Sequence, residues 1–474
     1  MTTTNTAEKQ PQIFVYDDIH PEDGAMLQAL YSRSPDSVVN HLEKVKAAGS
    51  GKFMSQYYVG YGHASIGDCG VTTIFIENYS MLAAKAIQDN ALYSGQEAST
   101  RYLDFAAQPL YDPYNHPASR AVLDGWMALY NGAMPKMKEA LSKRHPFDGS
   151  QYKSEKVWQN AIAARAFDIL RGFLPVGCTT LFSWTTNLRQ ARDRLMALKN
   201  HPLPEIRQLA QELFKTLYAK YPNSFTGEEM GENERYAARQ AYYAAQAERD
   251  NFVSVQNLLD EDRITEDDLD ELENGGMVIN KTELDVAGLY DFEQAAMNTR
   301  PEGASLNRRL GAYGVYQLTF LLDFGSYRDL QRHRNGVCQV PLIDGGFGIY
   351  PWYMNEVKGL LGAEDYAAFE AEVSRLLGAI DNLPAEVNAT PLLSQYLYPM
   401  GTAVMCQLAY TLPQMVYVAE LRAQKTVHPS LRPIAQAMGR VLANDFPDMK
   451  LYIDHDADGW SAKRGEQTIE AKVA

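Results

Sequence analysis

The feature that most constrains this fold is an internal repeat, because similar segments in one chain predict two copies of one structural unit. Leu174-Pro175-Val176-Gly177 resembles Tyr398-Pro399-Met400-Gly401, and the prolines lie 224 positions apart. Further on, Ile206–Gln211 resembles Leu431–Gln436, and the arginines at their second positions lie 225 positions apart. Two matches at nearly one offset predict a tandem duplication.

The boundary between the copies is predicted from an acidic run. The 474 residues allow two or three domains. Residues 260–273 are mostly Asp and Glu, with an N-cap pattern at Thr265 and Asp268 and an Asn-Gly-Gly helix stop at 274–276. We interpret this run as a solvated helix between two folded units rather than as an acidic binding site. The expected domains are a first repeat (1–235), a helical acidic linker (236–275) that begins with an Ala- and Tyr-rich helix, and a second repeat (276–474).

Both halves show the same order of elements. Each begins with a β-rich segment (Ile13–Tyr16 and Met277–Ile279) and continues into long helical stretches around one apolar run (Val71–Ile76 and Val315–Leu322). Strands and helices do not alternate regularly, so the predicted class is helix-rich α+β rather than a doubly wound sheet.

Composition excludes several classes of protein. The chain is 46% hydrophobic and 22% charged, which is typical of a globular protein and not of a disordered one. Its net charge of −15 argues against a polymeric nucleic acid partner but leaves room for a small anion held by local arginines. No apolar run reaches membrane-spanning length, and the N-terminus is too polar for a signal peptide. The four cysteines are far apart, which favours reduced core residues in a cytoplasmic protein without a metal site.

Three segments carry polar groups beside apolar ones. The first runs from Gly62–Asp68 through the apolar run to Ser94–Tyr102, and its Arg101 could grip a phosphate. From spacing alone, an ion pair between Glu97 and Arg101 explains this loop better.

The second segment is Arg328–Arg334, in which Arg332, His333 and Arg334 are consecutive. Arg328, Gln331 and Arg332 would share one helix face, and clustered cations next to an apolar run favour an anionic ligand over a solvated patch. The third segment holds Arg171 before Leu-Pro and Asn187 in an apolar stretch, where buried polar groups need partners.

Together these segments resemble the flavin-dependent thymidylate synthases, over most of residues 12–225 and more weakly over 277–452. That family has a Gly-His-x-Ser segment, an Arg-His-Arg run after an apolar helix, and a serine loop seven residues later. An arginine before Leu-Pro and an asparagine-bearing helix that ends in arginine follow. The combination is specific, although each piece alone is weak.

The family motif is divided between the two halves. The first half keeps Glu97, Ser99 and Arg101 of the serine loop but has residues 89–91 (Asp-Asn-Ala) in place of Arg-His-Arg. The second half keeps Arg-His-Arg at 332–334 but has Leu342 and Asp344 in place of the serine and arginine of the loop. Each copy has lost what the other retains.

The later motifs follow the same rule. Arg171 corresponds to Gln395, and Asn187 corresponds to Thr411. The arginine that ends the asparagine helix is Leu198 in the first half and Arg422 in the second. Since family sites lie between subunits, a fused pair would keep one composite site, and two chains would form a homodimer that is a pseudo-tetramer.

The resemblance implies FAD as cofactor, dUMP as substrate, methylenetetrahydrofolate as carbon donor and NADPH as reductant. Arg422 and Ser99 are the expected catalytic residues, with Arg422 stabilising negative charge on the uracil. The expected substrate contacts are Glu97, Ser99, Thr100, Arg101, Arg171, Asp329, Arg332 and Arg422. The expected cofactor contacts are His63, Ser65, Glu97, Asn187, Arg332, His333 and Arg334.

Departures from the family leave alternatives open. Asp68 and Cys69 replace the family's Glu-His, and Asp329 stands where the family usually has Gln. A relative that modifies another pyrimidine nucleotide, or a catalytically silent nucleotide- or flavin-binding scaffold of the same fold, also fits these features.

Overall fold

The computed structural model describes residues 19–32, 38–60, 63–225, 234–281, 283–456 and 460–466. Two compact units are present. The first combines residues 1–73, 185–196 and 211–238, and the second combines 74–184, 197–210 and 239–474. The first unit holds α1 (Pro21–Tyr31), α2 (Val38–Ala48), α3 (Gly51–Phe53), the π-helical turn η1 (Met54–Gly60) and the 3-10 turn η2 (Ala64–Cys69). Five elements have residues in both units: β1 (Val71–Ser80), β2 (Thr179–Asn187), α7 (Leu188–Leu198), α8 (Pro204–Lys220) and α9 (Glu234–Asn251).

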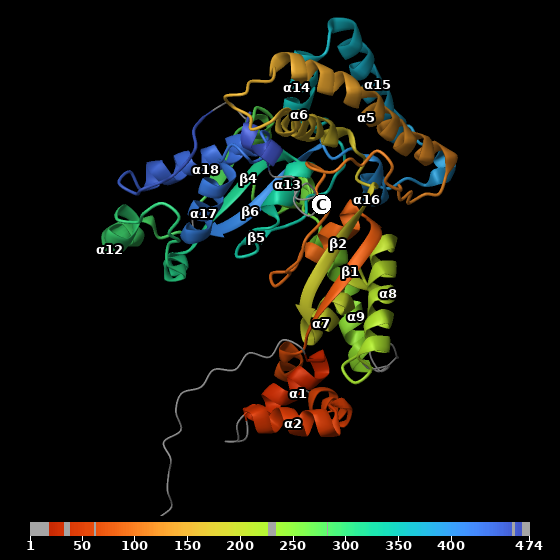
Figure 1. The fold of residues 1–474 in the computed structure, drawn as a ribbon, viewed down its shortest axis with the longest axis vertical. Coiled ribbons are helices and arrows are strands. Elements are labelled where there is room, and N and C mark those ends of the chain that lie inside the picture. Colours follow the sequence, from red (N-terminus) through yellow and green to blue (C-terminus); the bar gives the residue numbers. More distant parts are fainter. Residues whose placement is uncertain are drawn as a thin grey trace, which may run out of the picture. The chain divides into compact units, whose positions relative to one another are not determined.

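The second unit holds the remaining elements. Its helices are α4 (Met81–Gln88), α5 (Pro117–Arg144), α6 (Glu155–Leu170), α10 (Val255–Asp260), α11 (Glu266–Glu273), α12 (Val286–Asn298), α13 (Phe324–Leu330), α14 (Pro351–Leu360), α15 (Ala363–Asp381), α16 (Pro391–Ser394), α17 (Leu412–Arg422) and α18 (Arg432–Asp445). Its strands are β3 (Met277–Asn280), β4 (Val315–Asp323), β5 (Val337–Cys338) and β6 (Ala403–Thr411). Its 3-10 turns are η3 (Arg171–Phe173), η5 (Arg308–Tyr313), η6 (Ala385–Val387), η7 (Gln395–Leu397) and η8 (Ala462–Glu466). Helices α5, α6, α14 and α15 form one bundle (Figure 1).

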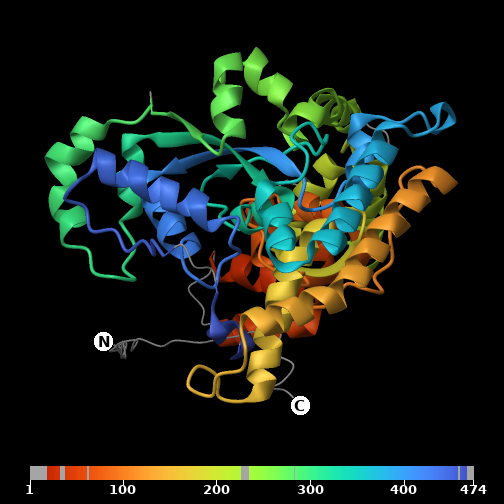
Figure 2. The same ribbon diagram turned by 90° about the horizontal axis from the view of Figure 1, so that it is seen from above.

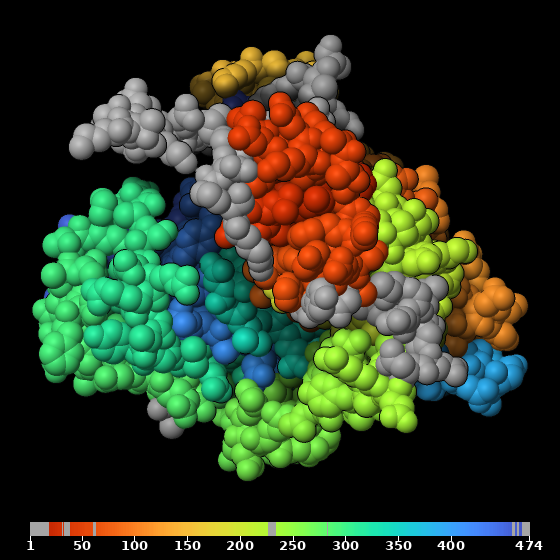
Figure 3. Space-filling view, turned by 90° about the horizontal axis from the view of Figure 1, so that it is seen from below, coloured from red at the N-terminus to blue at the C-terminus, as the bar shows by residue number. Residues whose placement is uncertain are grey.

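Polar contacts tie the first unit together at the start of α7. Arg189 donates to both carboxylate oxygens of Asp68, at 2.7 and 2.8 Å, and the amide of Leu188 donates to the Gly70 carbonyl at 2.9 Å. Gly70 has no room for a side chain, because a Cβ there would lie 2.8 Å from the Pro21 carbonyl oxygen. Figure 3 shows the residues of α1 and α2, in red, as one continuous surface.

The central sheet of the second unit has the strand order β3-β4-β6-β5, with every neighbouring pair antiparallel. Because side chains alternate along a strand, the even-numbered residues of β4 and β6 share one face and the odd-numbered residues the other. On the odd face, Leu321 and Met405 pack with Leu258 of α10 and Leu272 of α11. On the even face, the Tyr316 hydroxyl donates to Asp445 of α18 at 3.0 Å. Helices therefore cover both faces of the sheet (Figure 2).

The same elements recur at a nearly constant spacing in the chain. β6 and α17 begin 224 residues after β2 and α7, whereas β4 begins 244 residues after β1 and α13 begins 243 after α4. The one-residue difference lies in β1, which has ten residues against nine in β4. Asn78 of β1 has a φ of 63°, a left-handed conformation that fits one extra residue in a strand.

Equivalent loops of the two halves exchange hydrogen bonds within the second unit. The Val176 amide donates to the Tyr398 carbonyl, and the Met400 amide donates to the Leu174 carbonyl, both at 2.8 Å. Adding 224 to the residues of one bond gives those of the other with their roles exchanged. Gly177 to Tyr396, at 2.8 Å, and Gly401 to Gly172, at 2.7 Å, form a second such pair. A twofold axis between two copies of one unit produces this reciprocity.

The helix-rich α+β class is confirmed, and several local expectations can be compared with the structure. Met277–Asn280 is a strand, and α11 has the capping box of Thr265 and Asp268. The expectation of a purely solvated acidic helix is wrong, since Leu272 is fully buried against the sheet. Burial of such a side chain stabilises the fold by about 1.5–3 kcal/mol. The expected β-segment Ile13–Tyr16 lies outside the described residues.

Two further sequence features can be checked. All four cysteines are free, but only Cys178, Cys338 and Cys406 are buried, so Cys69 is not a core residue. Among the described helices, none is both long enough and apolar enough to cross a bilayer.

Candidate active site

Glu97 lies at the centre of a buried ionic cluster in the second unit. Its carboxylate binds Lys85 Nζ at 2.8 Å, the guanidinium of Arg328 and the amide nitrogen of Gln88 at 3.1 Å. Burial alone would raise the pKa of Glu97, but Arg328 and Lys85 outweigh it and lower the pKa to about 2. The loop after α4 thereby meets α13 of the other half. The expected ion pair between Glu97 and Arg101 is wrong.

Arg101 has a different carboxylate as its partner. Its Nε donates to Asp168 Oδ1 at 2.7 Å, and one Nη donates to Asp168 Oδ2 at 3.3 Å and to the Thr426 carbonyl at 3.2 Å. The fully buried Asp168 also binds Arg464, which comes from η8 near the C-terminus. Arg101 is therefore fixed by segments from both halves. Of its neighbours, Thr100 is buried, and Ser99 Oγ accepts from the Arg101 amide at 3.3 Å.

Arg171, on η3, is buried beside the start of α13. It donates to Ser326 Oγ at 2.9 Å and lies 3.9 Å from Asp323. Asp323 also accepts from the Ser326 amide, from Ser430 and from the Tyr353 hydroxyl. The Nε of Arg171 has no hydrogen-bond partner among the described residues, so this guanidinium keeps one unused donor.

The Arg-His-Arg run follows α13 rather than extending it. The helix ends at Leu330, so Arg328 and Arg332 do not share a helix face as expected. Arg328 is buried, whereas the Arg332 side chain is half-exposed and lies 3.5 Å from Asp329. Burial would raise the pKa of Asp329, but Arg332 and Arg422 lower it well below its usual range. The Oδ2 atom of Asp329 is buried without a hydrogen-bond partner among the described residues.

His333 joins this turn to α17. Its Nε2 accepts from Arg422 Nε at 2.8 Å, and Arg422 also donates to the Asp329 carbonyl at 2.8 Å. Burial and the adjacent Arg422 lower the pKa of His333 to about 3, so the ring is neutral at pH 7. Arg334 donates to the Gln88 carbonyl at 3.0 Å and stacks over the ring of Tyr93.

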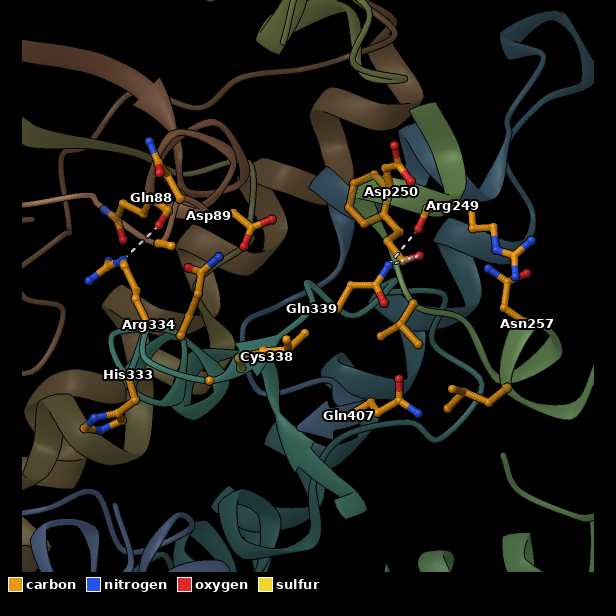
Figure 4. Close-up of a pocket in the computed structure, with 18 of the residues that line it drawn as sticks. Gln88, Asp89, Arg249, Asp250, Asn257, His333, Arg334, Cys338, Gln339 and Gln407 are labelled. Atoms are coloured by element: carbon orange, nitrogen blue, oxygen red, sulfur yellow. Dashed lines mark hydrogen bonds between the residues drawn. The ribbon is translucent and has the colours of Figure 1, made fainter. Parts of the chain in front are cut away.

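A cavity of about 480 Å³ opens beside this turn (Figure 4). His333 and Arg334 line one side, Arg249 and Asp250 line another, and Gln407 reaches it from β6. The cavity is large enough for a heterocyclic ring system.

Three expected cofactor residues, His63, Ser65 and Asn187, belong to the first unit. His63 is exposed, and the Ser65 carbonyl accepts from the Cys69 thiol at 3.7 Å. Asn187 accepts from the Gln190 amide at 2.9 Å at the start of α7. Their contact with a cofactor stays a prediction.

The structure adds residues that the sequence did not single out, namely Lys85, Asp168, Asp323, His428, Ser430 and Arg464. Lys85 could have been found, because it precedes Arg328 by the 243 residues that separate α4 from α13. His428 lies 2.8 Å from Ser430 and 3.0 Å from the Asp168 carbonyl, and it has no repeat signal in the sequence. Within the described ranges, no group of three His, Cys, Asp or Glu side chains could hold a metal ion.

Known proteins show the same affinity to a family that the motifs indicate. Residues 21–223 match the family model described as thymidylate synthase complementing protein. A UPF0159 protein of Thermoplasma acidophilum is 23% identical over 90% of this chain and 94% of its own length. UPF0159 proteins of Chlamydia pneumoniae and Chlamydia muridarum are each 24% identical over 83% of this chain and 78% of their own lengths. These relatives match across both halves of the chain.

Proposed function

Because residues 21–223 of this chain belong to the thymidylate synthase complementing family, we propose that the protein is a flavin-dependent thymidylate synthase that converts dUMP to dTMP. The observation that carries this proposal is the contact of Glu97, from the loop retained in the first half, with Arg328, four residues before the Arg-His-Arg run of the second half. The residues that each half retains thus belong to one cluster.

The charge of this cluster fits an anionic substrate. Eight cationic side chains meet only four carboxylates: Lys85, Arg101, Arg171, Arg328, Arg332, Arg334, Arg422 and Arg464 against Glu97, Asp168, Asp323 and Asp329. A phosphate dianion would reduce the excess. We assign the phosphate to Arg101 and Arg171, with Ser99 and Thr100 beside it, and the unused Nε of Arg171 fits this role.

The residues around the Arg-His-Arg turn fit an anionic cofactor with a ring system. Arg332 is half-exposed, and its nearest carboxylate lies 3.5 Å away, while His333 and Arg334 line the 480 Å³ cavity. We assign FAD to Arg332, His333 and Arg334, with Glu97, His63, Ser65 and Asn187 as further contacts. Bound FAD, reduced by NADPH, would supply the hydride, and methylenetetrahydrofolate would supply the carbon.

The assigned role of Arg422 is to stabilise negative charge that develops on the uracil. Its Nε and one Nη are held by His333 and the Asp329 carbonyl, so the guanidinium is preorganised. The neutral His333 accepts a hydrogen bond from Arg422 and adds no repelling charge.

We also propose that the two halves, 1–235 and 276–474 with the linker 236–275, are copies of one unit. The constant element spacing and the reciprocal hydrogen bonds support this duplication. A homodimer that mimics a family tetramer is the proposed assembly, and the free cysteines fit the reducing cytoplasm.

One observation favours a second substrate of the same class. Asp329 replaces a family Gln, and its Oδ2 is a buried acceptor without a partner. A carboxylate accepts hydrogen bonds and cannot donate them, so a base with an additional donor, such as cytosine with its exocyclic amine, fits this position.

Tritium release from dUMP labelled at C5 tests the function, with methylenetetrahydrofolate, FAD and NADPH present. The wild-type protein should release tritium and should purify with bound FAD or bind it tightly. Arg332→Ala should weaken flavin binding, whereas Asn90→Ala, at the approximately equivalent position of the other half, should not. Equal loss of flavin in both variants would exclude the divided site.

The same assay separates the alternatives. Release from labelled dCMP but not from dUMP would assign the second substrate. A protein that binds FAD and nucleotide without turnover would be the silent scaffold.

A further inference from the structure

The C-terminal turn η8 is packed against α6, where it contributes a buried arginine. The Gly465 position has no room for a side chain, since a Cβ there would lie 2.0 Å from the Val157 carbonyl oxygen. Trp460, just before the turn, stacks on His145 with ring centroids 3.8 Å apart and donates to the Tyr152 hydroxyl at 3.1 Å. The turn is therefore held closely against the body of the second unit.

Arg464 makes three contacts around the loop of the proposed phosphate site. It binds the carboxylate of Asp168, which also binds Arg101. It lies 3.4 Å from the Arg101 carbonyl as a hydrogen-bond donor, and its guanidinium lies 5.2 Å from the centre of the Tyr102 ring. The side chain thus contacts both the charge and the backbone of this loop.

The charges in this cluster give Arg464 a function that a packing contact would not have. Asp168 is fully buried, so its negative charge is poorly screened by water. Paired with Arg101 alone, it would cancel the charge of that guanidinium. With Arg464 as a second cation, the group of three keeps one net positive charge for an incoming anion. Burial, together with the nearby Arg101, lowers the pKa of Arg464 to about 9, which still leaves it protonated at pH 7.

We propose that Arg464 is a positioning residue that keeps the Arg101 loop cationic and oriented, and so sets the affinity of this enzyme for the phosphate of its nucleotide. The inference rests on the proposed function, in which Arg101 binds that phosphate. Residues 21–223, which match the family model, do not include Arg464, so a segment far along the chain completes a site built by the first half.

Titration of the full-length protein with dUMP and with deoxyuridine tests this role, because only dUMP carries the phosphate. Arg464→Met removes the charge and keeps an unbranched side chain. It should weaken dUMP binding roughly tenfold, lower its dependence on salt and leave deoxyuridine binding unchanged. Arg464→Lys restores the charge and should recover most of the dUMP affinity. Asp168→Asn combined with Arg464→Met restores the net charge of the cluster and should recover affinity as well.

The control is Lys153→Ala, which removes an exposed ion pair of 3.0 Å to Glu466 of the same turn and should change neither affinity. Equal loss of dUMP and deoxyuridine binding in Arg464→Met, without rescue by Lys, would assign a structural role only and overturn the inference. Unchanged dUMP binding in a folded Arg464→Met protein would also overturn it and leave the proposed function standing. A wild-type protein that binds dUMP no better than deoxyuridine would overturn both.

Discussion

Two buried carboxylates of the second unit each bind two cations from distant parts of the chain. Glu97 binds Lys85 and Arg328, and Asp168 binds Arg101 and Arg464. A buried charge is costly unless it is paired, so each cation depends on its carboxylate and the reverse. These ion pairs hold segments together in the geometry that the proposed site needs.

Glu97→Gln should destabilise the protein strongly, because it leaves Lys85 and Arg328 buried without a counter-charge. The expected loss is roughly 3–5 kcal/mol of the free energy of unfolding, measured by denaturant titration. The matched control is Glu139→Gln, which removes an exposed ion pair with Lys143 and should change stability by less than about 0.5 kcal/mol. A loss of similar size in both variants would contradict the central role of Glu97.

Acid should destabilise the fold through His333 and Glu97. The pKa of His333 is about 3 in the folded protein and about 6.5 in the unfolded chain, so between these values only the unfolded chain binds the proton. Stability therefore falls as the pH falls from about 6.5 towards 3, by up to roughly 1.4 kcal/mol per pH unit. Glu97, with a pKa of about 2 against 4.5 unfolded, adds a further loss as the pH falls from about 4.5 towards 2.

Histidine-selective NMR checks the origin of this effect, with the His333 signal assigned from a His333→Gln variant. The ring should show no titration between pH 8 and pH 5. A midpoint near 6.5 would contradict the neutral acceptor role.

Sequence reasoning found residues through motifs but not their ionic partners. Arg332, His333, Arg334 and Arg101 were located because their neighbours in the sequence form recognisable patterns. Spacing rules apply only to nearby residues on one element, which is why they favoured the wrong pair of Glu97 and Arg101. The partner of Arg101 is 67 residues away and that of Glu97 is 231 away, so only the folded chain shows them.

At the scale of elements, helix type was easier to predict than helix length. The capping pattern at Thr265 correctly marked the start of α11, because capping depends on adjacent residues. The end of α13 at Leu330 was missed, since the residues that follow it carry no glycine or proline until Gly336. That end places Arg332 at the surface and leaves Arg328 buried, a division that helical periodicity could not predict.

The reciprocal loops supply a prediction about glycine. A Cβ at Gly177 would lie 2.9 Å from the Tyr396 carbonyl oxygen, and one at Gly401 would lie 2.7 Å from the Gly172 carbonyl oxygen. Gly177→Ala and Gly401→Ala should therefore separate the paired loops and cost about 1–3 kcal/mol each.

The control for these variants is Gly132→Ala in α5, where no neighbouring atom lies within 4 Å of the added Cβ. It should stabilise the helix by roughly 0.5–1 kcal/mol. Thermal unfolding of the three variants distinguishes the two directions. A loss at Gly132 as large as at Gly401 would show that the reciprocal loops are not special.

At the scale of the molecule, compact units and sequence repeats are different divisions of the chain. The second unit combines residues 74–184 with residues 239–474, so it holds parts of both proposed repeats. The sequence offset indicated two related halves and the helix-rich class, because both follow from local patterns. It could not show that loops 174–177 and 398–401 bind one another, since that depends on how the copies pack.

The last prediction concerns whether the composite site lies within one chain or between chains. Glu97 and Arg328 form their ion pair in a single chain, and Arg101 is held by Asp168 and Arg464 of that chain. A chain with Ser99→Ala and a chain with Arg332→Ala would each damage their own site. Mixing the two full-length variants should therefore restore no tritium release, even when tagged copies show that mixed oligomers have formed. A single chain carrying both substitutions, mixed with wild-type chains, is the control and should leave the wild-type activity unchanged. Recovery of activity in the first mixture would place Ser99 and Arg332 of different chains in one site, as in a domain-swapped pair.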